Sequence, residues 1–116
     1  EMTAGVSIGY DWLYDTLTED NKRAIEKGLF EHGLSAGVSC YSGNFTKGWS
    51  CWWKSASMNW NQVCNGGMLM GAIAMWDVQN TASSFILNQT VQSIPLALDV
   101  YNPDGGWFEG PMYWAY

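Results

Sequence analysis

The chain has 116 residues, and 47% of them are hydrophobic, which is enough for one packed domain and excludes an intrinsically disordered chain. Eleven acidic residues against five basic ones give a net charge of −6. This balance argues against a nucleic-acid-binding surface, because too few cations are present to neutralise many phosphates. No apolar run approaches the roughly 20 residues that span a bilayer, so we expect no membrane-spanning segment.

Helical periodicity predicts two helices in the first third of the chain. Apolar residues recur every three or four positions from Ala4 to about Leu17, at Val6, Tyr10, Leu13 and Leu17. Thr18 then has the character of an N-cap, and the acidic residues at 19 and 20 suit the first turn of a second helix that extends to about Leu34. The short connection between the two makes them antiparallel neighbours.

Residues 37–54 lose this periodicity and are rich in Gly, Ser, Asn and aromatic residues, which predicts a long loop. Cys40 and Cys51 stand eleven positions apart across this segment. They suit a disulfide in an oxidising compartment, and free buried thiols are the alternative. The sequence leaves both open.

Two further helices are predicted in the second half. Residues from Asn59 to about Trp76 are apolar nearly all round, as is typical of an inner helix of a layered α structure. A fourth helix is predicted from about Ala82 to Tyr101, bent at Pro95 because proline removes one backbone donor. No alternation of the strand kind is present. We therefore expect an all-α fold of antiparallel helical hairpins.

The stretch WSCWWKSASMNWNQVCNGGMLMG, residues 49–71, places tryptophans directly before this inner helix. Their flat apolar faces suit stacking on sugar rings as well as burial. Asn59, Asn61 and Gln62 bring amide groups to the start of the helix, where free backbone N–H groups and the helix dipole already favour an anion. Amides beside aromatic side chains indicate a carbohydrate site.

A second stretch, PDGGWFEGPMYWAY, occupies residues 103–116. A Pro-Asp-Gly-Gly turn is followed by Trp107, Glu109, Tyr113 and Tyr116. Loops with this aromatic and ionisable character usually carry function.

NWNQVCNGG at 59–67 and PDGGWFEGPMYWAY at 103–116 together resemble the paired motifs of the heparinase II/III-like polysaccharide lyases. Residues 9–34 also resemble the helical hairpin that precedes the first motif in that family. The resemblance implies an (α/α) toroid, of which residues 1–116 would form a single partial domain, truncated at both ends. It also implies a secreted or periplasmic enzyme that acts on an acidic polysaccharide, with the rest of the toroid and a C-terminal β-sandwich domain as structural partners.

Lyases of this class cleave a uronic acid polymer by β-elimination. The carboxylate next to C5 must be neutralised, the C5 proton removed and the leaving oxygen protonated. The resemblance implies that Asn59 or Asn61 neutralises the carboxylate with help from Gln62, and that Tyr113 or Tyr116 is the catalytic phenol. We prefer Asn61, one turn into the helix, and Tyr116, farther from the Pro-Asp-Gly turn.

The family also uses a catalytic histidine, and no histidine of this chain matches a motif position. His32, the single histidine, lies near the predicted end of the second helix, where a surface role is expected. The missing histidine would have to come from beyond Tyr116. The resemblance leaves heparan-like, chondroitin-like and alginate-like substrates open.

For substrate contacts we expect stacking by at least one tryptophan and orientation of a hydroxyl by Glu109. The candidate platforms are Trp49, Trp52, Trp53 and Trp107, for which burial in the core is the alternative. Two other functions remain open, a glycoside hydrolase that uses Glu109 or Asp104 as general acid and a non-catalytic carbohydrate-binding segment. The chain has neither a Cys/His metal spacing nor a phosphate loop, so we expect no metal and no cofactor.

Overall fold

The computed structural model describes residues 1–45 and 51–114, and within them every regular element is helical, which confirms the predicted all-α fold. The helices are α1 (Met2–Leu13), α2 (Glu19–Leu29), α3 (Ser35–Tyr41), α4 (Asn59–Ala74), α5 (Asn80–Ser93), α6 (Pro95–Leu98) and α7 (Pro111–Trp114). Short 3₁₀ segments occupy Tyr14–Thr16, Trp52–Ser55 and Asp99–Tyr101, and a π-helical turn occupies Phe30–Leu34.

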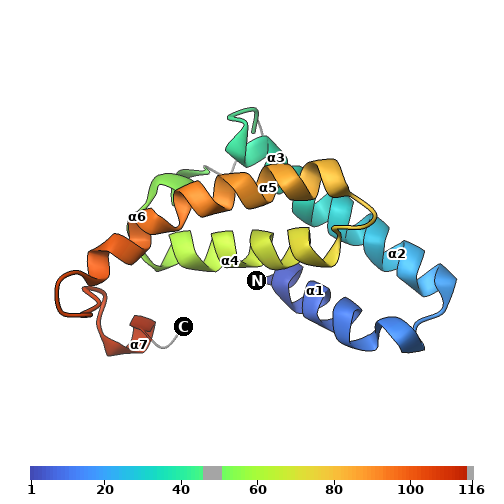
Figure 1. Cartoon of the computed structure of the whole chain (residues 1–116), viewed down its shortest axis with the longest axis horizontal. Coiled ribbons are helices and arrows are strands. Elements are labelled where there is room, and N and C mark those ends of the chain that lie inside the picture. The colour runs from blue at the N-terminus through green and yellow to red at the C-terminus, as the bar shows by residue number, and fades with distance from the viewer. Residues whose placement is uncertain (46–50, 115–116) are drawn as a thin grey trace.

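Helix α4 lies at the centre of the fold (Figure 1). Helix α1 packs against one side of it, and α5 runs antiparallel along another. The long α2–α3 segment crosses the far end of this pair and contacts both α4 and α5. The radius of gyration is 15.2 Å, larger than the about 13 Å expected of a compact domain of this length, so the helices form an elongated layer.

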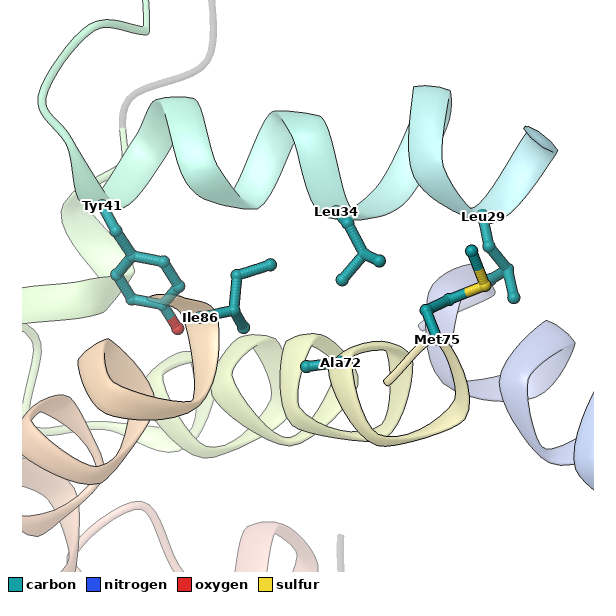
Figure 2. Packing of buried hydrophobic residues seen from close by; sticks show 6 residues of the cluster. All are labelled: Leu29, Leu34, Tyr41, Ala72, Met75 and Ile86. Atoms are coloured by element: carbon teal, nitrogen blue, oxygen red, sulfur yellow. The ribbon is translucent and has the colours of Figure 1, made fainter. Parts of the chain in front are cut away.

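The hydrophobic core lies where the α2–α3 segment faces α4 and α5 (Figure 2). Six buried side chains form it: Leu29, Leu34, Tyr41, Ala72, Met75 and Ile86. Burying one large apolar side chain contributes about 1.5–3 kcal/mol, so this cluster fixes the crossing of the two helix layers. At one close contact, a Cβ at Gly37 would displace the Met68 side chain of α4.

The α2–α3 segment differs from the sequence expectation. Thr18 caps α2 as predicted, since its Oγ1 accepts a hydrogen bond from the Asn21 N–H at 3.3 Å. The predicted end near Leu34 and the start of a loop at residue 37 are wrong, because the π-helical turn carries the helix through Gly33 into α3 and on to Tyr41. Burial of Leu34 and Tyr41 against α4 and α5 outweighs the weak helix propensity of the glycines.

The buried face of α1 also differs from the expected one. Tyr10 is buried as predicted, but Val6 and Leu13 are exposed, and Ser7 is buried instead. The reason is a close approach to α4, where a Cβ at Gly71 would stand 2.8 Å from Thr3 Cγ2. Small residues therefore face α4, and two residues of the predicted apolar stripe, Val6 and Leu13, are left exposed to solvent. The helix itself ends at Leu13, before a 3₁₀ turn, rather than at Leu17.

The second half of the chain follows the prediction more closely. Helix α4 begins at Asn59 as expected and ends at Ala74, two residues before the expected Trp76. The predicted fourth helix is interrupted where Pro95 was expected to bend it, since α5 ends at Ser93 and α6 begins at Pro95. Proline's lack of an N–H makes it suited to the first position of a new helix.

Cys40 and Cys51 form a disulfide, which decides between the two states that the sequence left open. The bond joins the end of α3 to the 3₁₀ segment Trp52–Ser55. Cys64 is a free cysteine, and burial raises the pKa of its thiol.

Several large apolar side chains are uncovered. Trp12 of α1 and Ile73 of α4 are 80% and 60% exposed, and they line a groove between the two helices together with Ile8 and Met70. In the part of the chain that the structure describes, no helix combines the length and hydropathy needed to cross a bilayer.

Candidate functional site

A pocket of about 550 Å³ lies between the start of α4 and α7, within the range of roughly 300–1,000 Å³ that small-ligand sites occupy. Its lining residues are Glu1, Asn59, Trp60, Val63, Met112 and Tyr113. The two stretches singled out in the sequence therefore meet at one site.

Asn59 is the first residue of α4 and is 8% exposed. Its backbone N–H donates to Glu109 Oε2 at 2.7 Å, and its side-chain Nδ2 donates to Glu109 Oε1 at 3.3 Å. The first N–H groups of a helix lack intrahelical acceptors, and the positive end of the helix dipole favours a carboxylate there. Glu109 thus binds the start of α4 rather than standing free in solvent.

Tyr113 belongs to α7 and is 48% exposed at the pocket. Its backbone N–H donates to the Gly110 carbonyl at 3.2 Å, which holds the turn that leads into the helix. Trp60, the residue after Asn59, presents a half-exposed indole to the same pocket. The pocket thus combines an amide, a phenol and an aromatic face.

Asn61, the preferred neutraliser in the sequence reasoning, is fully buried and does not line this pocket. Its Nδ2 lies 3.1 Å from the Trp53 carbonyl, 3.2 Å from the Ser93 carbonyl and 3.1 Å from Ser93 Oγ. Both amide hydrogens are therefore engaged inside the protein. Its donors hold the 3₁₀ segment against α5, and its Oδ1 is buried without a hydrogen-bond partner, so Asn61 does not face this pocket and its role as neutraliser stays a prediction.

Asn61 belongs to a buried polar network that joins three helices. Asn65 Nδ2 donates to Ser93 Oγ at 2.8 Å, and Ser93 Oγ donates to the Lys54 carbonyl at 2.7 Å. The Tyr41 hydroxyl donates to Asn65 Oδ1 at 2.6 Å and lies 3.0 Å from Thr90 Oγ1. Burial raises the pKa of Tyr41 to about 12, so the phenol stays protonated and remains a donor. The network is structural and fixes the start of α4 below the pocket.

The remaining predicted substrate contacts have different placements. Trp107 is 7% exposed and stacks on Tyr101, with ring centroids 4.8 Å apart, so it is a buried core residue in this structure rather than a sugar platform. Trp53 is partly buried edge-on against Tyr41. Trp52 is 48% exposed, and the Nε2 of half-buried Gln62 is buried without a hydrogen-bond partner. Trp49 and Tyr116 lie outside the described residues.

The surroundings of the pocket are acidic. Glu1 lines it, and Glu109 lies on Asn59 beside it. None of the described lysines and arginines lines it. Those on α2 pair with acidic residues of their own helix, and Lys54 donates to the Cys40 carbonyl at 2.7 Å. His32 lines a separate groove between α1 and α2. Among the described residues, then, no lysine, arginine or histidine side chain lines this pocket.

Trp60, Val63 and Met112 were not predicted as site residues. Asn59 and Val63 are four positions apart on one helix, so they share a face, and this spacing was available in the sequence. The contribution of α7 was not, because it depends on how the preceding loop folds back. In comparisons with known proteins, no family model matches the chain and no curated protein matches it.

Proposed function

We propose that the chain is part of the (α/α) toroid of a polysaccharide lyase that cleaves a uronic-acid polymer by β-elimination. The observation that carries this proposal is the shared pocket of Asn59 and Tyr113, an amide and a phenol from the two motif stretches. If the two stretches did not line one pocket, they could not form the single active site that the resemblance implies.

Each residue has a distinct role in the proposed reaction. The Asn59 amide donates a hydrogen bond to the substrate carboxylate, which lowers the energy of the carbanion-like state that forms when the C5 proton leaves. Tyr113 lines the same pocket, and its hydroxyl protonates the leaving oxygen as general acid. Trp60 offers a face on which a sugar ring stacks. The proton acceptor is either Tyr113 itself or a histidine from another part of the protein.

The charge around the pocket narrows the substrate class. In a polymer whose only anionic groups are carboxylates, one amide can neutralise the carboxylate at the cleavage site. Sulfate groups would bring further negative charge, and no described lysine or arginine lines the pocket to balance it. Because Glu1 and Glu109 are close to the site, additional anions on the substrate are repelled. We therefore place the substrate among unsulfated uronate polymers, of which the alginate-like class is one.

Two other features support the wider proposal. The uncovered apolar residues of α1 and α4 suit a piece that packs against further helical hairpins of a toroid. The Cys40–Cys51 disulfide supports a periplasmic or secreted location, where such bonds persist. A C-terminal β-sandwich domain remains part of the proposal through the resemblance alone.

The hydrolase alternative is less well supported by the contacts. Neither Glu109 nor Asp104 is among the residues that line the pocket. Both Glu109 oxygens accept hydrogen bonds from Asn59, and Asp104 Oδ1 accepts one from the Gly106 N–H at 3.0 Å within its own loop. The carbohydrate-binding alternative keeps the half-exposed Trp60 and Trp52 but no chemistry.

Product analysis separates the three functions. A lyase produces a C4–C5 double bond that absorbs in the ultraviolet, a hydrolase produces reducing ends without that absorbance, and a binding segment produces neither. We expect ultraviolet absorbance to rise when the full-length protein acts on an unsulfated uronate polymer, and we expect residues 1–116 alone to be inactive. Reducing ends without absorbance would favour the hydrolase instead.

A further inference from the structure

We propose that Glu109 is a positioning residue that sets the separation between the Asn59 amide and the Tyr113 hydroxyl. It does so by attaching the loop of residues 102–110, here called the docking loop, to the first residue of α4. This inference rests on the proposed function, and it replaces the direct substrate contact that the sequence reasoning gave to Glu109.

The contact between the docking loop and α4 is bidentate. One Glu109 oxygen accepts from the Asn59 backbone N–H at 2.7 Å, and the other accepts from the Asn59 side chain at 3.3 Å. The shorter distance is typical of a charge-assisted hydrogen bond, which is about twice as strong as a neutral one. Two bonds to one residue fix the orientation of the carboxylate as well as its position.

No residue next to the start of α4 caps the helix through its side chain, so the contact with Glu109 has a stabilising role there. Met58 stands at the N-cap position, and no side chain there accepts a hydrogen bond from the helix. A Ser, Asp or Asn at that position would accept from the N–H of the second or third helical residue without involving the docking loop. Glu109 instead accepts from the N–H of Asn59, the first residue, from 50 positions away, so stabilising the start of α4 and placing the docking loop are the same interaction.

The docking loop is braced internally, so the attachment extends to Tyr113. Trp107 stacks on Tyr101 with an interplanar angle of 22°. The Gly110 N–H donates to the Trp107 carbonyl at 3.1 Å, and the Tyr113 N–H donates to the Gly110 carbonyl at 3.2 Å. Tyr113 follows Glu109 by four residues, across Gly110 and the start of α7. A shift of Glu109 relative to α4 therefore moves the phenol relative to Asn59.

The first test observes the contact without reference to activity. In the unaltered protein, we expect the amide proton of Asn59 to resonate far downfield in an NMR spectrum and to move when acid protonates the Glu109 carboxylate. This movement should be absent in Glu109→Gln. It should persist in Asp104→Asn, the matched control, because Asp104 caps Gly106 within the same loop. If the chemical shift of the Asn59 amide proton has the same acid dependence in Glu109→Gln as in the unaltered protein, the inference is overturned.

The second test compares kinetics on an unsulfated uronate polymer. We expect kcat to fall about 100-fold in Glu109→Ala and about 10-fold in Glu109→Gln, since misplacement of about 1 Å costs about that much and Gln keeps one acceptor. KM should change less than about 3-fold, because Asn59 and Trp60 remain. Asp104→Asn should retain full kcat.

The outcomes distinguish the inference from the function on which it rests. Normal kcat in a folded Glu109→Ala variant would overturn the positioning role and leave the lyase proposal standing. A large rise of KM with unchanged kcat would return Glu109 to direct substrate binding. Absence of elimination by the unaltered protein, with the Asn59 amide still responding to Glu109, would remove the proposed function and the role of Glu109 in it.

Discussion

Asn59 and Tyr113 line one pocket although they belong to the first and last helices of the second half of the chain. The link between them is Glu109, whose carboxylate accepts both hydrogen bonds from Asn59. The buried network beneath α4 holds the other side of the same helix start. Predictions about activity and about stability therefore concern different residues.

Tyr113→Phe should abolish most elimination activity without unfolding the protein. Loss of a general acid typically lowers the rate by about 10²–10⁴-fold. The protein should stay folded because the half-exposed ring of residue 113 is kept. The measurement is kcat together with a thermal melt. The control is Tyr14→Phe, because Tyr14 is also exposed and does not line the pocket. If Tyr116→Phe loses activity while Tyr113→Phe does not, the original choice of phenol is restored.

Asn61→Ala should reduce stability rather than chemistry. The substitution removes the Asn61 donor from the Ser93 carbonyl, which then stays buried without a partner at a cost of about 1–3 kcal/mol. The Trp53 carbonyl keeps the Ala56 N–H, and Ser93 Oγ keeps Asn65 Nδ2. Urea unfolding measures this free energy. Asn88→Ala on the exposed face of α5 is the matched control and should change it by less than about 0.5 kcal/mol. Unchanged stability with lost activity would show Asn61 to be the neutraliser after all.

Stability should fall at alkaline pH because of Tyr41. Burial raises the pKa of Tyr41 from 10.0 to about 12, so the unfolded chain loses this proton at lower pH than the folded chain does. The stabilisation is complete below pH 10.0 and is lost as the pH rises toward about 12. Burial and the Glu26 hydrogen bond raise the pKa of Tyr10 in the same direction.

Unfolding free energies measured from neutral to alkaline pH check this prediction. The decline should be shallower in Tyr41→Phe, which has no phenol to ionise. An equal decline in both proteins would mean that Tyr41 does not contribute to it.

The acidic surroundings of the pocket predict an unusual salt dependence. A polyanion approaching a chain of net charge −6 is repelled, and added salt screens that repulsion. KM for a uronate polymer should therefore decrease as ionic strength rises, and more steeply for a sulfated polymer than for an unsulfated one. A KM that increases with salt would point to cations in the site, and would contradict the assignment to unsulfated substrates.

Local signals in the sequence predicted much of the fold. Thr18 caps one helix and Pro95 begins another, both at the predicted positions. These effects were predictable because they depend only on the local backbone hydrogen bonds of a helix. The buried face of α1 was not predictable in this way, because it depends on the contact of Thr3 with Gly71 of a distant helix. Tertiary packing there selects small residues over the apolar stripe.

The site was predictable in its residue types and not in its geometry. Asn59 and Asn61 look equivalent in the sequence, but Asn59 lines the pocket whereas Asn61 donates inward to Ser93 of α5. Trp107 likewise has the composition of a sugar platform until Tyr101 stacks on it. The role of Glu109 required knowledge of where the docking loop returns to the helix.

The most direct test of the central claim is the ultraviolet absorbance of an unsulfated uronate polymer incubated with the full-length protein and, in parallel, with its Asn59→Ala variant. If Asn59 and Tyr113 form a lyase site, absorbance rises with the unaltered protein and the rate falls about 100-fold or more in the variant, as expected for loss of a group that stabilises the developing charge. Equal rates with both proteins would contradict the account, because the pocket that joins the two motifs would then not be the site of elimination.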